Sequence, residues 1–155
     1  MIKEFILDKG TFLLQQSVKD WKEVVKKCVD LLVNAGVATH SYYEGILKMV
    51  EDYGPYFVIA PGIAMPHARP EMGALNTGFA LITLKEPVIF GHKDNDPVSI
   101  VLCICAKDSK DMNETAIIDA MSLIDEDEFI EELKSAKTKN DLAIVLAKAQ
   151  AAYDY

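Results

Sequence analysis

Apolar side chains recur every three to four residues along much of the chain, and this spacing predicts amphipathic helices. The clearest helix covers residues 17–35, where Ser17 is placed to cap the first turn. A second helix begins with Ser41-x-x-Glu44, the pattern of a capping box. Further helices are predicted over residues 1–10, 117–124 and 127–136, and from Thr138-x-x-Asp141 onward.

Short, continuous apolar runs predict β-strands between these helices. The run 98–106 is almost wholly apolar, as expected of a central strand that helices cover on both faces. Lys85-Glu86-Pro87 is expected to separate two shorter strands, because proline ends regular pairing. The other strands are predicted over residues 11–15, 56–60, 78–84 and 88–90.

This order of elements predicts an α/β fold. The short connections between residues 78 and 90 favour antiparallel neighbours, whereas the helical segments suit crossovers between parallel strands. The chain has 155 residues, half of them apolar, which is enough to build one hydrophobic core. We therefore expect a single three-layer domain over residues 1–155, with a mixed β-sheet flanked by helices on both faces. The pattern does not give the order of the strands.

Charge and composition narrow the class of partner. The formal net charge of −8 argues against nucleic acid or an anionic membrane as a partner and favours a protein with a basic face. No apolar run approaches the ~18–20 residues that span a bilayer, and the charged N-terminus lacks the core of a signal peptide, so a cytoplasmic protein is expected. The three cysteines are expected in the core, and a metal site is not expected.

A proline- and glycine-rich stretch at 54–71 presents the most reactive candidate, His67. Pro66 and Pro70 stiffen the backbone on both sides, which predicts a shaped loop that aims the imidazole. Apolar neighbours leave the ring poorly hydrated, while Arg69 is close enough to stabilise an anionic group. Two readings remain: a turn residue hydrogen-bonded to nearby backbone, or a neutral nucleophile that transiently carries a phosphoryl group.

The motif Gly62-Ile-Ala-Met-Pro-His67 resembles the phosphorylation site of the mannitol/fructose class of enzyme IIA components of the bacterial phosphoenolpyruvate-dependent sugar phosphotransferase system. The wider segments 54–71 and 92–98 are similar to the L-ascorbate-specific IIA branch. The resemblance covers nearly the whole chain.

The resemblance implies a phosphotransferase. His67 would take a phosphoryl group from the phosphohistidine of the histidine-containing phosphocarrier protein and pass it to a cysteine of the cognate IIB component, which serves a membrane IIC permease. Positioning and charge stabilisation suffice for such a transfer, so no metal or organic cofactor is expected. The ring nitrogen that stays unphosphorylated is expected to bind a carbonyl, which fixes the tautomer.

Two positions depart from the mannitol-type pattern. Met112 stands where those members have a second histidine, and Glu51 where they have an arginine. Arg69 is therefore predicted to stabilise the phosphoryl group. His92 is a possible supporting imidazole if its loop folds toward His67, although a solvated loop residue is the simpler interpretation.

Other functions stay open at this point. A regulatory phosphoacceptor, in which phosphorylation of His67 controls a transcription regulator or another target, has the same motif. A hydrolase with His67 as base is weakly supported, because no serine or cysteine nucleophile with a recognisable motif accompanies it. The sequence does not fix the sugar or the oligomeric state. Apolar residues that flank the loop are expected to form the centre of a partner surface, namely Phe57, Met65, Met72 and Met112.

Overall fold

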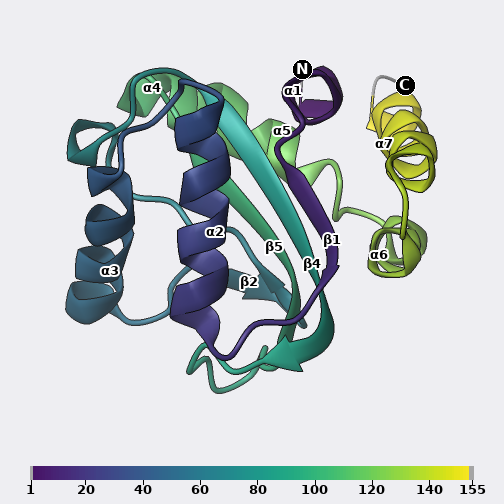
Figure 1. Cartoon of the computed structure of the whole chain (residues 1–155), viewed down its shortest axis with the longest axis horizontal. Helices are drawn as coiled ribbons and strands as arrows, with labels where there is room; N and C mark the ends of the chain where they lie inside the picture. The colour runs from purple at the N-terminus through teal and green to yellow at the C-terminus, as the bar shows by residue number, and fades with distance from the viewer. Residues whose placement is uncertain (1, 154–155) are drawn as a thin grey trace.

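A five-stranded mixed sheet lies between two layers of helices (Figure 1). The computed structural model describes residues 2–153. The strand order is β1-β4-β5-β3-β2, in which β4 runs antiparallel to β5, β3 runs parallel to β5, and β1 runs parallel to β4. The strands are β1 (Phe12–Gln16), β2 (Val58–Ala60), β3 (Ile63–Ala64), β4 (Gly78–Val88) and β5 (Val98–Cys105).

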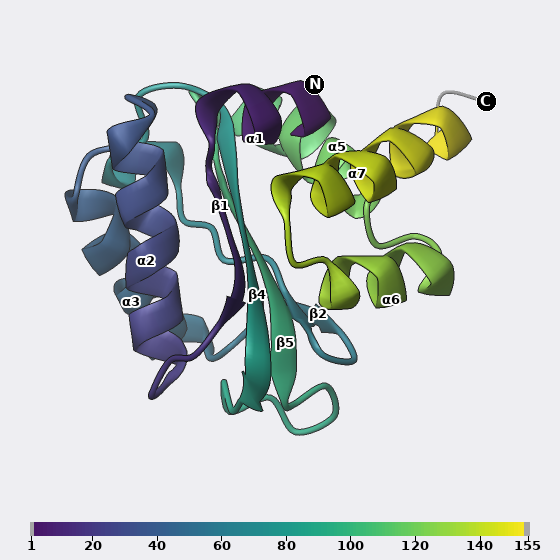
Figure 2. The same cartoon turned by 45° about the vertical axis from the view of Figure 1, so that its right-hand side comes forward.

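Figure 2 shows the sheet nearly edge-on, with α2 and α3 on one face and α5, α6 and α7 on the other. A short 3₁₀ turn, η1, follows the histidine loop (residues 65–69), and α4 and the π-helical turn η2 run directly into α5. The predicted three-layer arrangement is confirmed. The helical elements are α1 (Ile2–Lys9), α2 (Trp21–Asn34), α3 (Ser41–Tyr53), η1 (Pro70–Met72), α4 (Ser109–Asp111), η2 (Met112–Ala116), α5 (Ile117–Met121), α6 (Asp127–Ser135) and α7 (Lys139–Tyr153). None of the helices within residues 2–153 has the length and apolarity needed to cross a bilayer.

The sheet separates two hydrophobic cores, and its central strand β5 supplies side chains to both. Leu102 and Ile104 pack in the core beneath α5, α6 and α7, whereas Cys103 and Cys105 pack in the core beneath α2 and α3. Alternate side chains of a strand point to opposite faces, so a strand covered on both sides must be apolar throughout. Cys28 of α2 lies in the same core as Cys103, and all three thiols are buried, as predicted.

The predicted start of one helix is confirmed by its cap, whereas the cap predicted for another helix differs from the observed one. Thr138 and Asp141 cap the start of α7, where the sequence predicts that a helix begins: the Asp141 amide donates to Thr138 Oγ1 at 3.1 Å, and the Thr138 amide donates to Asp141 Oδ2 at 3.2 Å. The cap predicted at Ser17 is wrong. Asp20 caps α2 instead, since its backbone is extended and its carboxylate accepts the Glu23 amide at 2.9 Å.

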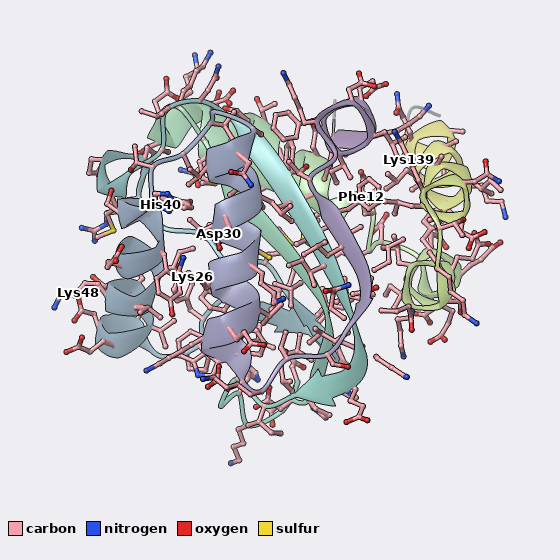
Figure 3. All side chains as sticks on the ribbon, in the orientation of Figure 1. Phe12, Lys26, Asp30, His40, Lys48 and Lys139 are labelled. Atoms are coloured by element: carbon pink, nitrogen blue, oxygen red, sulfur yellow. The ribbon has the colours of Figure 1, made fainter. Side chains whose placement is uncertain are left out.

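The capping box predicted at Ser41-x-x-Glu44 is also not formed. His40 takes the capping position of α3, without a side-chain cap bond, and its Nδ1 lies 3.8 Å from Asp30 Oδ1 of α2 (Figure 3). The Ser41 hydroxyl donates to the Met72 carbonyl at 3.3 Å. A tertiary contact with the segment that follows the histidine loop has thus replaced the local one.

Two strand predictions need correction. β4 continues through Lys85-Glu86-Pro87 to Val88, so the predicted break is wrong. Gln16 of β1 pairs with Leu84, and beyond it β4 has a neighbour on one side only, where a proline is tolerated. The short strand β3 lies inside the stretch predicted as loop, where it pairs with β2 on one side and with the remote strand β5 on the other.

Candidate functional site

The histidine loop leaves the carboxyl end of β3 beside the carboxyl end of β5. The Pro66 carbonyl accepts the Ile104 amide at 3.0 Å, and the Met65 amide donates to the Phe57 carbonyl at 2.8 Å, so the backbone stays tied to the sheet up to His67. The helical segment 109–121 starts at the same end of β5. In α/β sheets this edge, beyond the carboxyl ends of parallel strands, is where ligands commonly bind.

A pocket of about 160 Å³ opens at this edge. Its walls combine the imidazole and the guanidinium of the loop with two thioethers and two small polar side chains. The thioether of Met112 is almost fully buried, which keeps that wall dry. Larger hollows between α6 and α7 and along α2 have no histidine in their lining. The residues that line the pocket are Met49, His67, Ala68, Arg69, Pro70, Ser109, Met112 and Asn113.

The tautomer of His67 is set by a bond to its own loop. Nδ1 lies 2.7 Å from the Met65 carbonyl oxygen, and a carbonyl can only accept, so Nδ1 carries the hydrogen. The predicted bond between a ring nitrogen and a carbonyl is therefore confirmed. Nε2 keeps its lone pair and has no hydrogen-bond partner among residues 2–153.

The charge of the ring follows from its surroundings. Burial lowers the pKa of His67 below the ordinary value of 6.5, and the hydrogen bond to Met65 only partly opposes this effect. At neutral pH the imidazole is therefore neutral, with a nucleophilic Nε2.

Two tyrosines that sequence reasoning missed contact the histidine loop. The Tyr56 hydroxyl donates to the His67 carbonyl, and the two rings meet edge to face, with centroids 5.4 Å apart. The Tyr42 hydroxyl accepts the Ala68 amide at 3.0 Å. Neither phenol belongs to a recognisable motif, and Tyr42 reaches the loop only because α3 packs beside it. Tyr56 does lie two residues before β2, which places it across the β2–β3 hairpin from His67.

Arg69 lines the same pocket as His67, but its side chain is exposed. Its backbone is extended, with φ −65° and ψ 142°, as Pro70 dictates. Nη2 lies 3.4 Å from the Tyr53 hydroxyl at the end of α3, a long and weak contact. The guanidinium is thus at the rim of the pocket, free of any carboxylate in the described part of the chain.

The loop of His92 does not fold toward His67. His92 Nδ1 accepts the amides of Asp94 and Asn95 at 3.2 and 3.1 Å, and the Asn95 carbonyl accepts the Gly62 amide at the amino end of β3. That loop precedes β5, whereas His67 lies beside the last residues of β5. At about 3.3 Å per residue the two ends of this strand are roughly 20 Å apart.

Of the two positions that depart from the mannitol-type pattern, one lines the pocket and the other does not. Met112 is a wall of it, while Glu51 is exposed on α3 and does not line it. The expected partner surface also needs correction: Phe57, Met65 and Met112 are all buried, although Met112 also lines the pocket, and Met72 is half-buried against the core beneath α2 and α3.

Comparisons with known proteins agree on one family. Residues 5–149 match the model of the phosphoenolpyruvate-dependent sugar phosphotransferase system EIIA 2 family. The chain is 41% identical over 151 residues to the ascorbate-specific PTS system EIIA component of Escherichia coli strain K12, covering 97% of this chain and 98% of that one.

Solved structures give the same result. A PTS IIA crystal structure from Streptococcus mutans (PtxA) superposes with a TM-score of 0.89 at 35% identity, covering 97% of this chain and 96% of that chain. The solution structure of the mannitol-specific cryptic enzyme IIA CmtB from Escherichia coli gives a TM-score of 0.82 at 32% identity, covering 96% and 99%.

Proposed function

The chain belongs to the EIIA 2 family of the phosphoenolpyruvate-dependent sugar phosphotransferase system, and on that basis we propose that it carries phosphoryl groups for L-ascorbate uptake. His67 accepts the phosphoryl group from the phosphohistidine of the phosphocarrier protein and donates it to a cysteine of the IIB component. The observation that carries this proposal is the bond from His67 Nδ1 to the Met65 carbonyl, because it leaves Nε2 as the nucleophile in the pocket.

Neither of the two phosphoryl transfers requires a proton to move to or from another residue. In the first, Nε2 of His67 attacks phosphorus, an Nε2–P bond forms, and the P–N bond of the donor breaks, with its electron pair returning to the donor imidazole. The phosphorylated His67 ring keeps its Nδ1–H, and the Met65 carbonyl stabilises the positive charge that the ring then carries. In the second, the thiolate of the IIB cysteine attacks phosphorus, and the Nε2–P bond breaks to restore the neutral ring.

The phosphoryl group gains stabilisation from the pocket walls. A loose transition state spreads charge over the phosphoryl oxygens, so donors and cations placed beforehand matter more than acid–base groups. Arg69 is the cation in the pocket lining and is proposed as the phosphate-stabilising residue. Ser109 lies where the helical segment 109–121 begins, which adds a partial positive charge. His92 has no part in this scheme because of its distance from His67.

We propose the other partners and the cellular location of the chain on the basis of the same function. The chain acts as one domain in the cytoplasm and takes its phosphoryl group from the phosphocarrier protein. It serves the membrane IIC permease through IIB. The apolar walls of Met49 and Met112 limit the access of water to the phosphohistidine, which slows its hydrolysis before IIB arrives.

A reconstituted uptake assay tests the proposal. Purified chain is combined with phosphoenolpyruvate, enzyme I and the phosphocarrier, together with either the IIB component and IIC-containing vesicles of an L-ascorbate system and labelled L-ascorbate, or those of a mannitol system and labelled mannitol. We expect phosphorylation of L-ascorbate that depends on the chain and is lost in His67→Ala. Phosphorylation of mannitol alone would contradict the sugar assignment. A label that remains on the chain after IIB is added would indicate a regulatory phosphoacceptor instead.

A further inference from the structure

The peptide group that joins His67 to Ala68 is held at both ends by tyrosine hydroxyls. Tyr56 donates to the carbonyl oxygen of His67, and Tyr42 accepts the amide hydrogen of Ala68 at 3.0 Å. This peptide group is the one directly after the nucleophile. Its orientation therefore sets the direction in which the Cα–Cβ bond of His67 points.

Each tyrosine is itself held by the rest of the fold. Tyr42 is fully buried on α3, and its own hydroxyl hydrogen is donated to the Ile104 carbonyl at 2.6 Å, which ties the loop to β5. Tyr56 packs edge to face against Phe57 as well as against the His67 imidazole, with centroids 5.2 Å apart in the first case. The two hydroxyls thus connect the loop to a helix, a strand and the hairpin that precedes it.

Both phenols keep their hydrogen at neutral pH. Burial raises the pKa of Tyr56 to about 12, and burial also raises the pKa of Tyr42 well above its ordinary value. Neither hydroxyl acts as an acid or a base at neutral pH. Their contribution is geometric.

We propose that Tyr42 and Tyr56 are positioning residues for phosphoryl transfer, forming a clamp on the His67–Ala68 peptide that aims Nε2 into the pocket. This inference rests on the proposed function, since it assigns the two phenols to the reaction of the same histidine. In-line attack tolerates little error in direction, so loosening the clamp lowers the rate of transfer more than the affinity for the partner. The imidazole then also spends part of its time away from the Met65 carbonyl.

Tyr56→Phe is the decisive variant, because it keeps the ring and removes only the hydroxyl. In single-turnover transfer from the phosphorylated phosphocarrier, we expect a three- to tenfold lower maximal rate, with the half-saturating donor concentration unchanged within twofold. Tyr42→Phe is expected to lower the rate as well. Tyr43→Phe is the matched control, since Tyr43 is a half-buried phenol on the same helix that does not line the pocket, and its rate should stay within twofold of wild type.

Nitrogen-15 NMR of His67 tests the clamp without any phosphoryl donor. In the wild type, the Nδ1 and Nε2 shifts should be those of one fixed tautomer, and in Tyr56→Phe they should move toward each other. Unchanged shifts and an unchanged rate in a folded Tyr56→Phe protein would overturn the clamp while leaving the proposed function intact. A wild-type chain that accepts no phosphoryl group would refute the proposed function, and the NMR result would still decide whether Tyr56 orients the ring.

Discussion

The Nδ1 atom of His67 lies 2.7 Å from the carbonyl oxygen of Met65, only two residues earlier in the chain. This contact gives the two ring nitrogens different roles: Nδ1 donates to the loop, and Nε2 is left to react. The loop is rigid enough to maintain it, because prolines lie on both sides of His67 and backbone hydrogen bonds tie the loop to β5. The choice of the reacting nitrogen therefore follows from the fold of a few consecutive residues.

Burial of His67 predicts a specific dependence of stability on pH. The pKa of His67 is lowered below 6.5, so in the range just below 6.5 the unfolded chain binds more protons than the folded chain. The contribution of His67 to the free energy of unfolding is thus fully present above pH 6.5 and is lost as the pH falls through the lowered pKa.

Urea unfolding of wild type and His67→Gln across pH 5 to 8 measures this contribution as the difference between their free energies of unfolding, which removes the effects common to both proteins. The difference should be flat at the alkaline end and should decrease on acidification. The transfer rate should decrease over the same range, as the nucleophile becomes protonated. A difference that increases on acidification would contradict a neutral, buried imidazole.

We expect replacement of Arg69 to lower the rate of phosphoryl transfer by an amount that depends on the new side chain. Hydrogen bonds to charged groups contribute about 1.5–3 kcal/mol, so Arg69→Ala should slow single-turnover transfer roughly ten- to hundredfold. Arg69→Lys should give an intermediate rate, because it keeps the charge but loses the planar fork. The melting temperature should stay nearly constant, since the side chain is exposed and its contact with Tyr53 is weak.

Lys93→Ala is the control for the Arg69 series, because it removes one exposed positive charge from the loop of His92, far from the pocket. Its transfer rate should equal that of wild type. Equal rates in all the Arg69 variants would show that backbone donors alone stabilise the phosphoryl group.

The start of α2 gives a stability prediction that separates two candidate caps. Asp20→Ala removes the acceptor for the Glu23 amide and should lower the free energy of unfolding by about 0.5–2 kcal/mol. Ser17→Ala should change it by less than about 0.5 kcal/mol, because Ser17 is exposed and lies outside the helix. Denaturant unfolding of both variants measures these free energies. A larger loss of stability in Ser17→Ala than in Asp20→Ala would show that Ser17 caps the helix.

The parts of the fold that the sequence predicted are those that depend on local pattern. Periodic apolar residues located α2, α3, α6 and α7 to within a few positions, and the continuous apolar run located β5. Apart from the cap of α2, where Asp20 takes the place of Ser17, the errors occur where a remote partner decides the outcome. Strand β3 lies between β2 and β5, and no local pattern reveals that Ile63 and Ala64 pair with Ile100 and Val101 of the remote strand.

The features of the site also divide into those that neighbouring residues determine and those that remote parts of the chain determine. The stiff loop and the extended Arg69 follow from prolines in the sequence. The Tyr42 contact, the burial of Met65 and the separation of His92 from His67 depend on how the helices and strands pack together, which the sequence pattern leaves open. His92 is instead held by its own loop, where the Asp96 carboxylate accepts backbone amides, including that of His92.

The central claim is that Nε2 of His67 carries the phosphoryl group, and labelling followed by phosphorus–nitrogen NMR tests it most directly. Incubation with phosphoenolpyruvate, enzyme I and the phosphocarrier should give one label that is labile in acid, stable in alkali and bonded to Nε2 of His67. The label should persist in His40→Ala and His92→Ala and be absent from His67→Ala. A label that is stable in acid, that survives in His67→Ala, or that is bonded to Nδ1 would contradict the account.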